Sequence, residues 1–418
     1  MRQVHLLKMA VTVLAGFLAL HAMSEPTVSD VAVRQRWPWS RLVDIDYVVT
    51  CEATQRVDVT LTAYNGVTRL ALPETSLSGD RYTVGQGTKR IVWNPALSGH
   101  TNEVITQFRV ELTAELCPLY LVIDLTDGST ATNYPVTTYQ TAADVPGGIT
   151  NDLYKTTHLL MRRIINGSFM MGESVNYNVT LTKDYYIGVY EVTQKQWQLV
   201  TGGTPSWYNN AAYSATRPVE RLRYTDIRGN TTDNPTVNWP LTGHYVKPNT
   251  FFDRLRNRTG FMTCDLPTDA QWEYACRAGT STYYNDGLGT PSNLKTNAQM
   301  DVLGRYKYNG GHIYNGSAWV APAQNCTDVN GPAKVGSYLP NNWGLYDMHG
   351  NIYEWVLDQW GALAHATDPV GATNSTYRVA RAGGYGNEGD YTDSGQRTAL
   401  DPIMLGDFMG FRVVRTLP

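Results

Sequence analysis

NNWGLYDMHGNIYEWVLDQW, residues 341–360, is the stretch that decides the fold. Two of its carboxylates, Asp347 and Glu354, are flanked by four aromatic residues, Trp343, Tyr346, Tyr353 and Trp355, which predicts that both are at least partly buried. A buried carboxylate is costly unless it is paired or bound to a metal. Gly350 permits a sharp turn that offers carbonyl oxygens, and carboxylates with free carbonyls suit a hard cation such as Ca²⁺. Two interpretations stay open: a calcium site, or a turn capped by Asp347 with Glu354 paired to an arginine.

Five segments along the chain follow one another in an order that is typical of a known family. They are GSFMMG (167–172), YYIGVYEVTQKQW (185–197), LPTDAQWEYACRAG (266–279), VGSYLPNNWGLYDMHGN (335–351) and GFRVVR (410–415). Together, across roughly residues 155 to 418, they resemble the formylglycine-generating enzyme (sulfatase-modifying factor) family. The resemblance implies a C-type-lectin-like α+β fold. Function still has to be argued from the site, because one fold hosts many activities.

The resemblance also implies a calcium site in the opening stretch. Its ligands would be the side chains of Asp347 and Glu354 and the backbone carbonyls of Gly350 and Ile352. Relatives carry a second calcium ion, held by the segment before Val335, but the ligands of that site cannot be placed in this sequence.

The catalytic centre of the family is predicted to be missing. Formylglycine-generating enzymes hold copper on two cysteines that follow a Gly-Gly turn. Here that segment reads RVARAGGYGNEGDYTDSGQRTALDP (378–402), and the cysteine positions fall near Asn387 and Thr392. No cysteine follows Cys326. Because Cu(I) needs soft sulfur ligands, we expect neither copper nor formylglycine chemistry. The eight histidines are scattered without a metal-binding spacing, so iron is not expected either.

The same segment is rich in Gly, Asn, Asp and Tyr, which combine adaptable hydrogen bonding with rigid aromatic surface. We therefore expect a groove that binds a peptide, glycan or protein ligand, and its predicted residues are Tyr385, Asn387, Tyr391, Thr392 and Arg397.

Two other functions remain open from sequence. One is an enzyme of the same family, an oxidoreductase or other, with an altered centre near residues 384–397. That centre would be built from His349, Asp390, Asp393 and Arg397. The other is a purely structural surface protein. Arg397 itself has two interpretations, contact with an anionic ligand or pairing with a core carboxylate, so whether the chain is an enzyme stays undecided.

The first 24 residues have the pattern of a secretory signal peptide. A positive start is followed by the apolar run MAVTVLAGFLAL (9–20), which is too short to span a bilayer comfortably, and by small residues at 22–24. We expect cleavage after Ser24 and a periplasmic, extracellular or cell-surface location; an uncleaved anchor is the alternative. No later apolar stretch is long enough for a membrane span.

Residues 25–117 are predicted to form an immunoglobulin-like β-sandwich. Short segments with partial alternation and many Val, Ile, Thr and Tyr residues are separated by turns, a pattern typical of sandwiches. Trp93 is expected in its core. Residues 118–152 are predicted to hold one strand and a linker, and residues 153–418 the α+β domain.

Helices are expected where caps precede apolar periodicity. Thr193 can cap one helix, and Thr268 is followed three residues later by Gln271, which is a capping box. A third helix is expected at 251–260. Cys264 and Cys276 are predicted to be core residues, whereas Cys51 and Cys117 could form a disulfide that sequence cannot establish.

The charge balance excludes one class of partner. The chain has 34 Lys and Arg against 37 Asp and Glu, a formal net charge of −3. That balance gives no basic footprint for nucleic acid.

Overall fold

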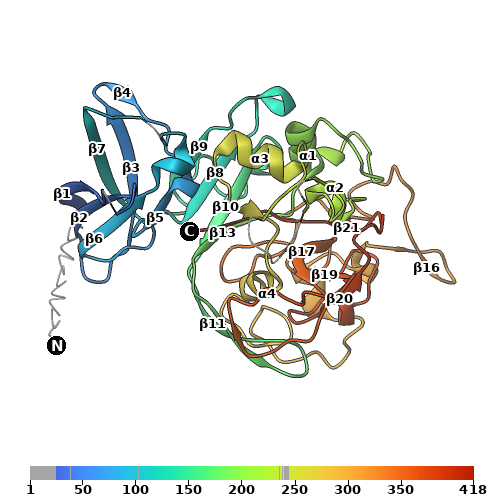
Figure 1. Ribbon diagram of the computed structural model, residues 1–418. Helices are drawn as coiled ribbons and strands as arrows, with labels where there is room; N and C mark the ends of the chain where they lie inside the picture. Colours follow the sequence, from blue (N-terminus) through green and yellow to red (C-terminus); the bar gives the residue numbers. More distant parts are fainter. Residues whose placement is uncertain (1–24, 38, 102, 235, 238, 240–243) are drawn as a thin grey trace, which may run out of the picture.

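The computed structural model describes residues 25–37, 39–101, 103–234, 236–237, 239 and 244–418. Within them the chain forms an N-terminal sandwich and a larger C-terminal module, residues 118–418 (Figure 1). The predicted signal peptide lies outside the described residues. Among the helices that are described, none is long and apolar enough to cross a membrane.

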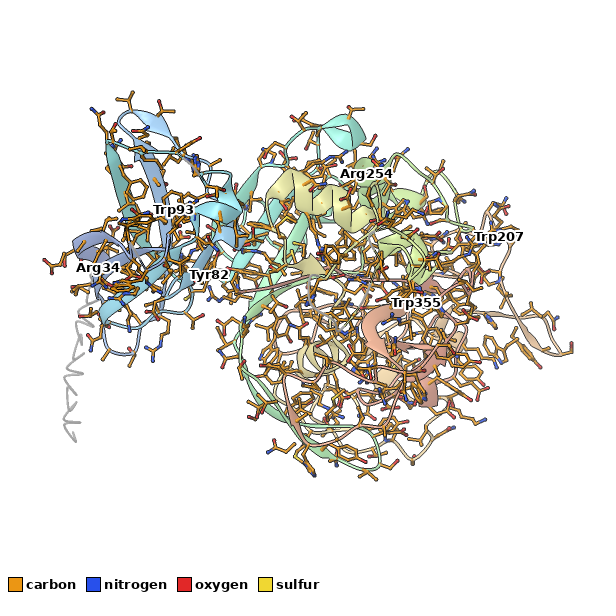
Figure 2. All side chains as sticks on the ribbon, in the orientation of Figure 1. Arg34, Tyr82, Trp93, Trp207, Arg254 and Trp355 are labelled. Atoms are coloured by element: carbon orange, nitrogen blue, oxygen red, sulfur yellow. The ribbon has the colours of Figure 1, made fainter. Side chains whose placement is uncertain are left out.

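The sandwich consists of two antiparallel sheets. One has the strand order β1 (Thr27–Gln35), β2 (Val43–Thr50), β6 (Gly87–Trp93), β5 (Leu77–Gly79), and the other β4 (Thr68–Arg69), β3 (Val57–Asn65), β7 (Phe108–Leu116). Trp93 is buried between the sheets and stacks on Phe108, with ring centroids 5.2 Å apart (Figure 2). The predicted core role of Trp93 is confirmed.

A six-stranded sheet forms the half of the module next to the sandwich (Figure 1). Its order is β14 (Cys264–Asp265), β22 (Val414–Thr416), β13 (Tyr185–Gly188), β10 (His158–Ile164), β8 (Tyr120–Asp124), β9 (Val136–Tyr139). β8 and β9 come from residues 118–152, which were expected to hold one strand and a linker. That segment is therefore an integral part of the module's sheet.

Three smaller sheets complete the module. They are β11 (Gly167–Met171), β12 (Tyr177–Leu181), β18 (Ala366–Thr367); β20 (Thr398–Leu400), β19 (Arg378–Arg381), β17 (Tyr353–Gln359), β21 (Met409–Gly410); and the hairpin β15 (Ile313–Tyr314), β16 (Trp319–Val320). β17 contains the second half of the opening stretch and lies between β19 and β21. This interior position explains why its side chains are nearly all buried.

The described helices are short. They are α1 (Gln194–Thr201), α2 (Tyr224–Arg228), α3 (Phe251–Thr259), α4 (Asp269–Arg277) and α5 (Ala298–Leu303). Both predicted caps are confirmed, because Thr193 and Thr268 each accept a hydrogen bond from the backbone N–H three residues later. The capping box predicted at Thr268 is present, and Thr193 forms one as well, which was not predicted. α3 ends at Gly260, which adopts a φ of +76° that favours glycine.

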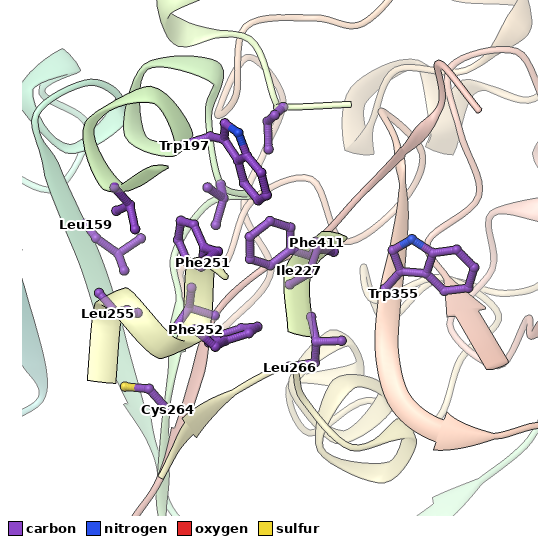
Figure 3. Packing of buried hydrophobic residues seen from close by; sticks show 14 of the residues in the cluster. Leu159, Trp197, Ile227, Phe251, Phe252, Leu255, Cys264, Leu266, Trp355 and Phe411 are labelled. Atoms are coloured by element: carbon purple, nitrogen blue, oxygen red, sulfur yellow. The ribbon is translucent and has the colours of Figure 1, made fainter. Parts of the chain in front are cut away.

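Aromatic side chains join the helices to the end of the chain. Trp197 of α1 stacks on Phe251 of α3 at 5.5 Å, and Phe411 meets Phe251 edge-on at 5.0 Å (Figure 3). Such pairs stabilise a core beyond their buried area. The module therefore has an α+β fold in which irregular loops are fixed by aromatic clusters.

Buried ion pairs join the sandwich to the module. Arg163 of β10 bonds Asp184 at 2.9 Å and reaches across to Asp58 of β3 at 2.6 Å. Arg415 of β22 bonds Glu74 in the sandwich at 2.9 Å. Both arginines are buried. Separating the sandwich from the module would therefore break these ion pairs and leave each arginine without its partner in the sandwich.

Candidate functional site

Glu354 begins the site, because it is a fully buried carboxylate on the central strand β17. The Arg412 guanidinium donates two hydrogen bonds to it, at 2.6 and 2.7 Å. Trp272 of α4 adds a third from its indole N–H at 2.8 Å. Of the two interpretations left open by the sequence, the structure shows Glu354 paired with an arginine. Arg412, between β21 and β22, is correspondingly a structural partner.

Asp347, seven residues earlier, is also buried but forms no salt bridge within the described part of the chain, although the charges of Arg412 and Lys155 attract it. Its Oδ2 accepts one hydrogen bond from the Gly336 N–H at 2.7 Å. Its Oδ1 has no hydrogen-bond partner among the described residues. Burial raises the pKa of this carboxyl to about 6. The residue adopts a φ of +58°, so local structure holds the side chain at this place against an intrinsic backbone preference.

Glu191 is a third buried carboxylate, which the sequence analysis did not identify. It precedes α1 and is fully buried. Its oxygens accept from the Asn351 amide at 2.6 Å and from the Ile352 N–H at 3.2 Å. Burial and repulsion from Asp347 raise its pKa well above the usual range. The available signal was an isolated acidic residue inside the apolar run YYIGVYEV.

These three carboxylates place more negative charge in the interior than Arg412 alone can balance. A cation beside the Asp347 Oδ1 would relieve that excess, and carboxylate and carbonyl oxygens are the ligands that calcium prefers. Across the described part of the chain, no three His, Cys, Asp or Glu side chains are close enough to hold a metal. Calcium here would therefore depend on backbone oxygens, which the predicted set includes at Gly350 and Ile352. The residues present fit such an ion.

The turn at Gly350 is fixed by close packing. Its φ is +77°, and a Cβ atom there would lie 2.2 Å from the carbonyl oxygen of Arg305. Its N–H donates to the Ala382 carbonyl at 2.7 Å. Only glycine fits this position, so the carbonyl direction at the predicted calcium ligand is set by the fold.

Two members of the predicted ligand groove are buried. The Tyr385 hydroxyl lies 2.9 Å from the Tyr208 hydroxyl, and the ring is almost inaccessible. The Thr392 hydroxyl donates to the Gly389 carbonyl at 2.8 Å and is fully enclosed. Both side chains stand behind the surface, so a ligand approaching from solvent would not reach them directly.

The other members are more accessible. Tyr391 is 47% exposed. Asn387 is partly exposed, and its side-chain oxygen accepts from the Gly384 N–H at 2.9 Å. Arg397 bonds Asp269 at 2.7 Å and lies over the Trp360 ring at 4.7 Å. For Arg397 the core-carboxylate interpretation therefore describes the contact seen.

Cys276 is a cysteine that lies behind the groove residue Thr392. Its sulfur lies 3.9 Å from Nε2 of His349, whose Nδ1 is 2.6 Å from the Thr392 carbonyl oxygen. Burial raises the pKa of the Cys276 thiol to about 12 and lowers the pKa of His349 to about 4. Cys264 packs in a different core cluster. Both cysteines are buried core residues, as expected, and no described cysteine is disulfide-bonded, including Cys51 and Cys117.

The residues considered for an altered catalytic centre are only partly brought together. His349 contacts Thr392, and Asp393 follows it in the chain as another buried residue. Burial and nearby Glu173 raise the pKa of Asp393 to about 7. Arg397 is instead committed to Asp269. An open cleft lined by all of these groups is not what the described residues form, because His349 and Asp393 are enclosed.

Comparison with known proteins defines the class. The sulfatase-modifying factor enzyme 1-like domain matches residues 153–417, and the chain belongs to this family. The chaperone protein LppX of Paenibacillus barcinonensis is 30% identical over 262 residues, covering 57% of this chain and 82% of LppX. The formylglycine-generating enzyme of Thermomonospora curvata is 30% identical over 157 residues, covering 35% of this chain and 48% of that enzyme. The match thus spans about half of that enzyme's length.

Among solved structures, Treponema denticola variable protein 1 aligns with 24% identity and a TM-score of 0.46. The alignment covers 62% of this chain and 96% of that protein. PvdO from Pseudomonas aeruginosa aligns with 23% identity and a TM-score of 0.45, covering 62% and 95%.

Proposed function

We propose that this protein is an exported, non-oxidising member of its family. In this proposal a groove near residues 385–397 binds a peptide, glycan or protein ligand, and calcium stabilises the module. The observation that carries it is the lack of a thiol pair in the groove. The family resemblance implies that Asn387 and Thr392 stand near the positions of the family's cysteines, and the neighbouring Cys276 is a buried thiol with a raised pKa.

The missing thiol pair matters because copper needs soft ligands. Thiolate sulfur selects Cu(I), whereas amide and hydroxyl oxygens do not. A thiol also has to be deprotonated before it can bind a metal, and a thiol pKa of about 12 keeps Cys276 protonated near neutral pH. A single protonated thiol behind Thr392 gives poor support for copper-dependent oxidation of a substrate cysteine.

Calcium is proposed at the opening stretch. Asp347 Oδ1 and the carbonyls of Gly350 and Ile352 would hold it, with Glu354 as the fourth ligand shared with Arg412. When bound, the ion would supply positive charge beside Asp347 and Glu191. Because it would bind the native state and not the unfolded chain, it would add about 2.7 kcal/mol at 100 times its dissociation constant.

Ligand binding is proposed for the outward-facing part of the groove. Tyr391 and Asn387 would make the direct contacts, while Tyr385 and Thr392 would support them from behind and Arg397 through its pair with Asp269. One relative, LppX, bears the name of a chaperone, and others are formylglycine-generating enzymes. The names of the relatives thus include both a chaperone and an enzyme.

A conversion assay tests the non-oxidising proposal. The purified protein would be incubated with copper and a cysteine-containing peptide of the sulfatase type, and the products read by mass spectrometry. We expect no conversion to formylglycine. Copper-dependent turnover that disappears in Cys276→Ser would contradict the proposal and favour an enzyme with a relocated centre. Intact mass of the exported protein tests cleavage after Ser24.

A further inference from the structure

The hairpin β15–β16 projects from the module away from the sandwich (Figure 1). It carries exposed apolar and aromatic side chains, with Tyr314 55% exposed and Ile313 and Val320 each 39% exposed. The surrounding stretch from Asn309 to Cys326 contains no Asp, Glu, Lys or Arg. The hairpin is therefore an uncharged, aromatic projection whose two strands, among the residues that the structure describes, pair only with each other.

A chain of aromatic rings connects the hairpin to the core. Trp319 meets Tyr314 across the two strands at 5.5 Å and contacts Tyr308 edge-on at 5.0 Å. Tyr308 in turn contacts the buried Tyr306 at 5.7 Å. An isolated two-stranded hairpin is only marginally stable, so these contacts hold the exposed rings in place.

Hydrogen bonds connect the inner end of this row of aromatic rings to the ligand groove. The Tyr308 hydroxyl and the Lys307 ammonium both donate to Oε1 of Glu388, at 2.7 and 3.0 Å. Lys295 bonds the other carboxylate oxygen at 2.9 Å. The Lys307 N–H donates to the Asn387 carbonyl at 2.8 Å. The aromatic hairpin and the groove are thus one continuous surface with a fixed polar rim.

We propose that this surface binds carbohydrate, with a sugar ring against Tyr314 and Trp319 and sugar hydroxyls bonded by Asn387, Glu388 and Lys307. A pyranose has an apolar C–H face and a rim of neutral hydroxyls. Aromatic rings offer rigid, amphipathic contact area for the face, and amide, carboxylate and ammonium groups supply acceptors and donors for the rim. The inference rests on the proposed ligand groove and names its ligand class.

The same features disfavour other occupants. The uncharged hairpin offers no attraction to anionic lipids or charged peptides, which need basic or acidic side chains, and the lysines at its base are already paired with Glu388. Addition of a peptide strand needs a sheet edge with a run of main-chain groups, and β15 and β16 contain two residues each. A neutral polyhydroxyl ligand needs neither feature.

Affinity electrophoresis tests this inference with the full chain. Native gels would contain laminarin, xylan, hydroxyethyl cellulose or glycol chitin, and retardation would be measured against polysaccharide concentration. We expect retardation by at least one of them. Trp319→Ala and Tyr314→Ala should each weaken it roughly tenfold, about 1.4 kcal/mol. Tyr377→Ala is the matched control, because Tyr377 is 50% exposed and precedes β19, where its carbonyl accepts from the Trp360 N–H, and it should bind normally.

The outcomes separate this inference from the proposed function. Unchanged unfolding curves would show that the hairpin variants are folded. Retardation that survives both substitutions would overturn the aromatic hairpin as the site. A second outcome would be no retardation by any of the four polysaccharides together with binding to a random-sequence peptide array that Tyr391→Ala abolishes. That outcome would overturn the carbohydrate inference but would support the ligand groove. Binding to neither probe would count against both.

Discussion

Glu354 and Asp347 are two buried carboxylates of one short segment with opposite surroundings. Glu354 accepts three hydrogen bonds, two of them from Arg412. Asp347 accepts one and leaves an oxygen without a described partner. A buried carboxylate with an internal cation is a structural element, whereas one without a cation is strained until a proton or a metal reaches it. The comparison indicates that the segment combines a permanent internal pair with a place for an external ion.

The largest expected effect comes from removing the internal cation. Arg412→Met should lower the free energy of unfolding by about 3–5 kcal/mol, because Glu354 would remain buried and unpaired. Urea denaturation measures the loss. The double variant Arg412→Met/Glu354→Leu removes both charges and should recover part of it. Equal losses in the single and double variants would show that packing, and not the uncompensated charge, dominates.

Asp347 should give the next largest effect, through pH. Its pKa of about 6 in the folded protein lies above the ordinary value of 3.8, so the folded state holds its proton more tightly than the unfolded chain. Its contribution to stability is complete below pH 3.8 and is lost as pH rises toward 6. In metal-free protein the loss should be roughly 3 kcal/mol, since each pKa unit corresponds to about 1.36 kcal/mol.

Asp347→Asn cannot ionise and should lack this part of the pH dependence. Stability measured in chelator from pH 3.5 to 7.5 for both proteins isolates the difference, because other buried carboxyls titrate in each. Identical profiles would mean that Asp347 does not carry the excess charge.

A smaller effect should follow from weakening the compensation of Glu354. Trp272→Phe removes one hydrogen bond to a charged group, which is worth about 1.5–3 kcal/mol. Trp355→Phe is the control, because Trp355 is equally buried and donates at 2.9 Å to the neutral Leu222 carbonyl. Chemical denaturation should show a greater loss for Trp272→Phe than for Trp355→Phe. The reverse order would indicate that ring volume decides.

The smallest effect is expected at the surface. Glu388 has two lysine partners and a tyrosine, which lower its pKa to about 2, yet it lies near solvent. Glu388→Gln should change stability by less than about 1 kcal/mol, because exposed ion pairs contribute little. Thermal denaturation at low and high salt measures it. A change as large as that of Arg412→Met would contradict the view that burial, and not the number of partners, sets the cost.

Local sequence signals predicted the fold well. Thr193 and Thr268 carry their capping boxes within four residues, and Trp93 lies in a strand segment that was predicted from its partial alternation and its turn-forming flanks. The ordered motifs of the family identified the module, and its α+β class is confirmed. These features depend on near neighbours or on motif order, both of which a sequence displays directly.

The site could be predicted only in part. Asp347 and Glu354 were found because they share a motif, but Glu191 joins them from 156 residues earlier, which no local pattern reveals. Tyr385 and Thr392 looked like groove residues, yet the loop turns both inward. Side-chain direction in an irregular loop follows from tertiary packing, so composition indicates the region and not the contacts.

Calcium titration followed by thermal unfolding tests the central claim most directly. Wild-type protein stripped with chelator should melt at a lower temperature and recover when calcium is added, with a shift that grows with free calcium. Asp347→Gly is the variant to compare, because glycine accepts the φ of +58° at this position without strain and offers no ligand; its melting temperature should not respond. A wild-type melting temperature that changes with neither chelator nor calcium would contradict the proposed calcium site.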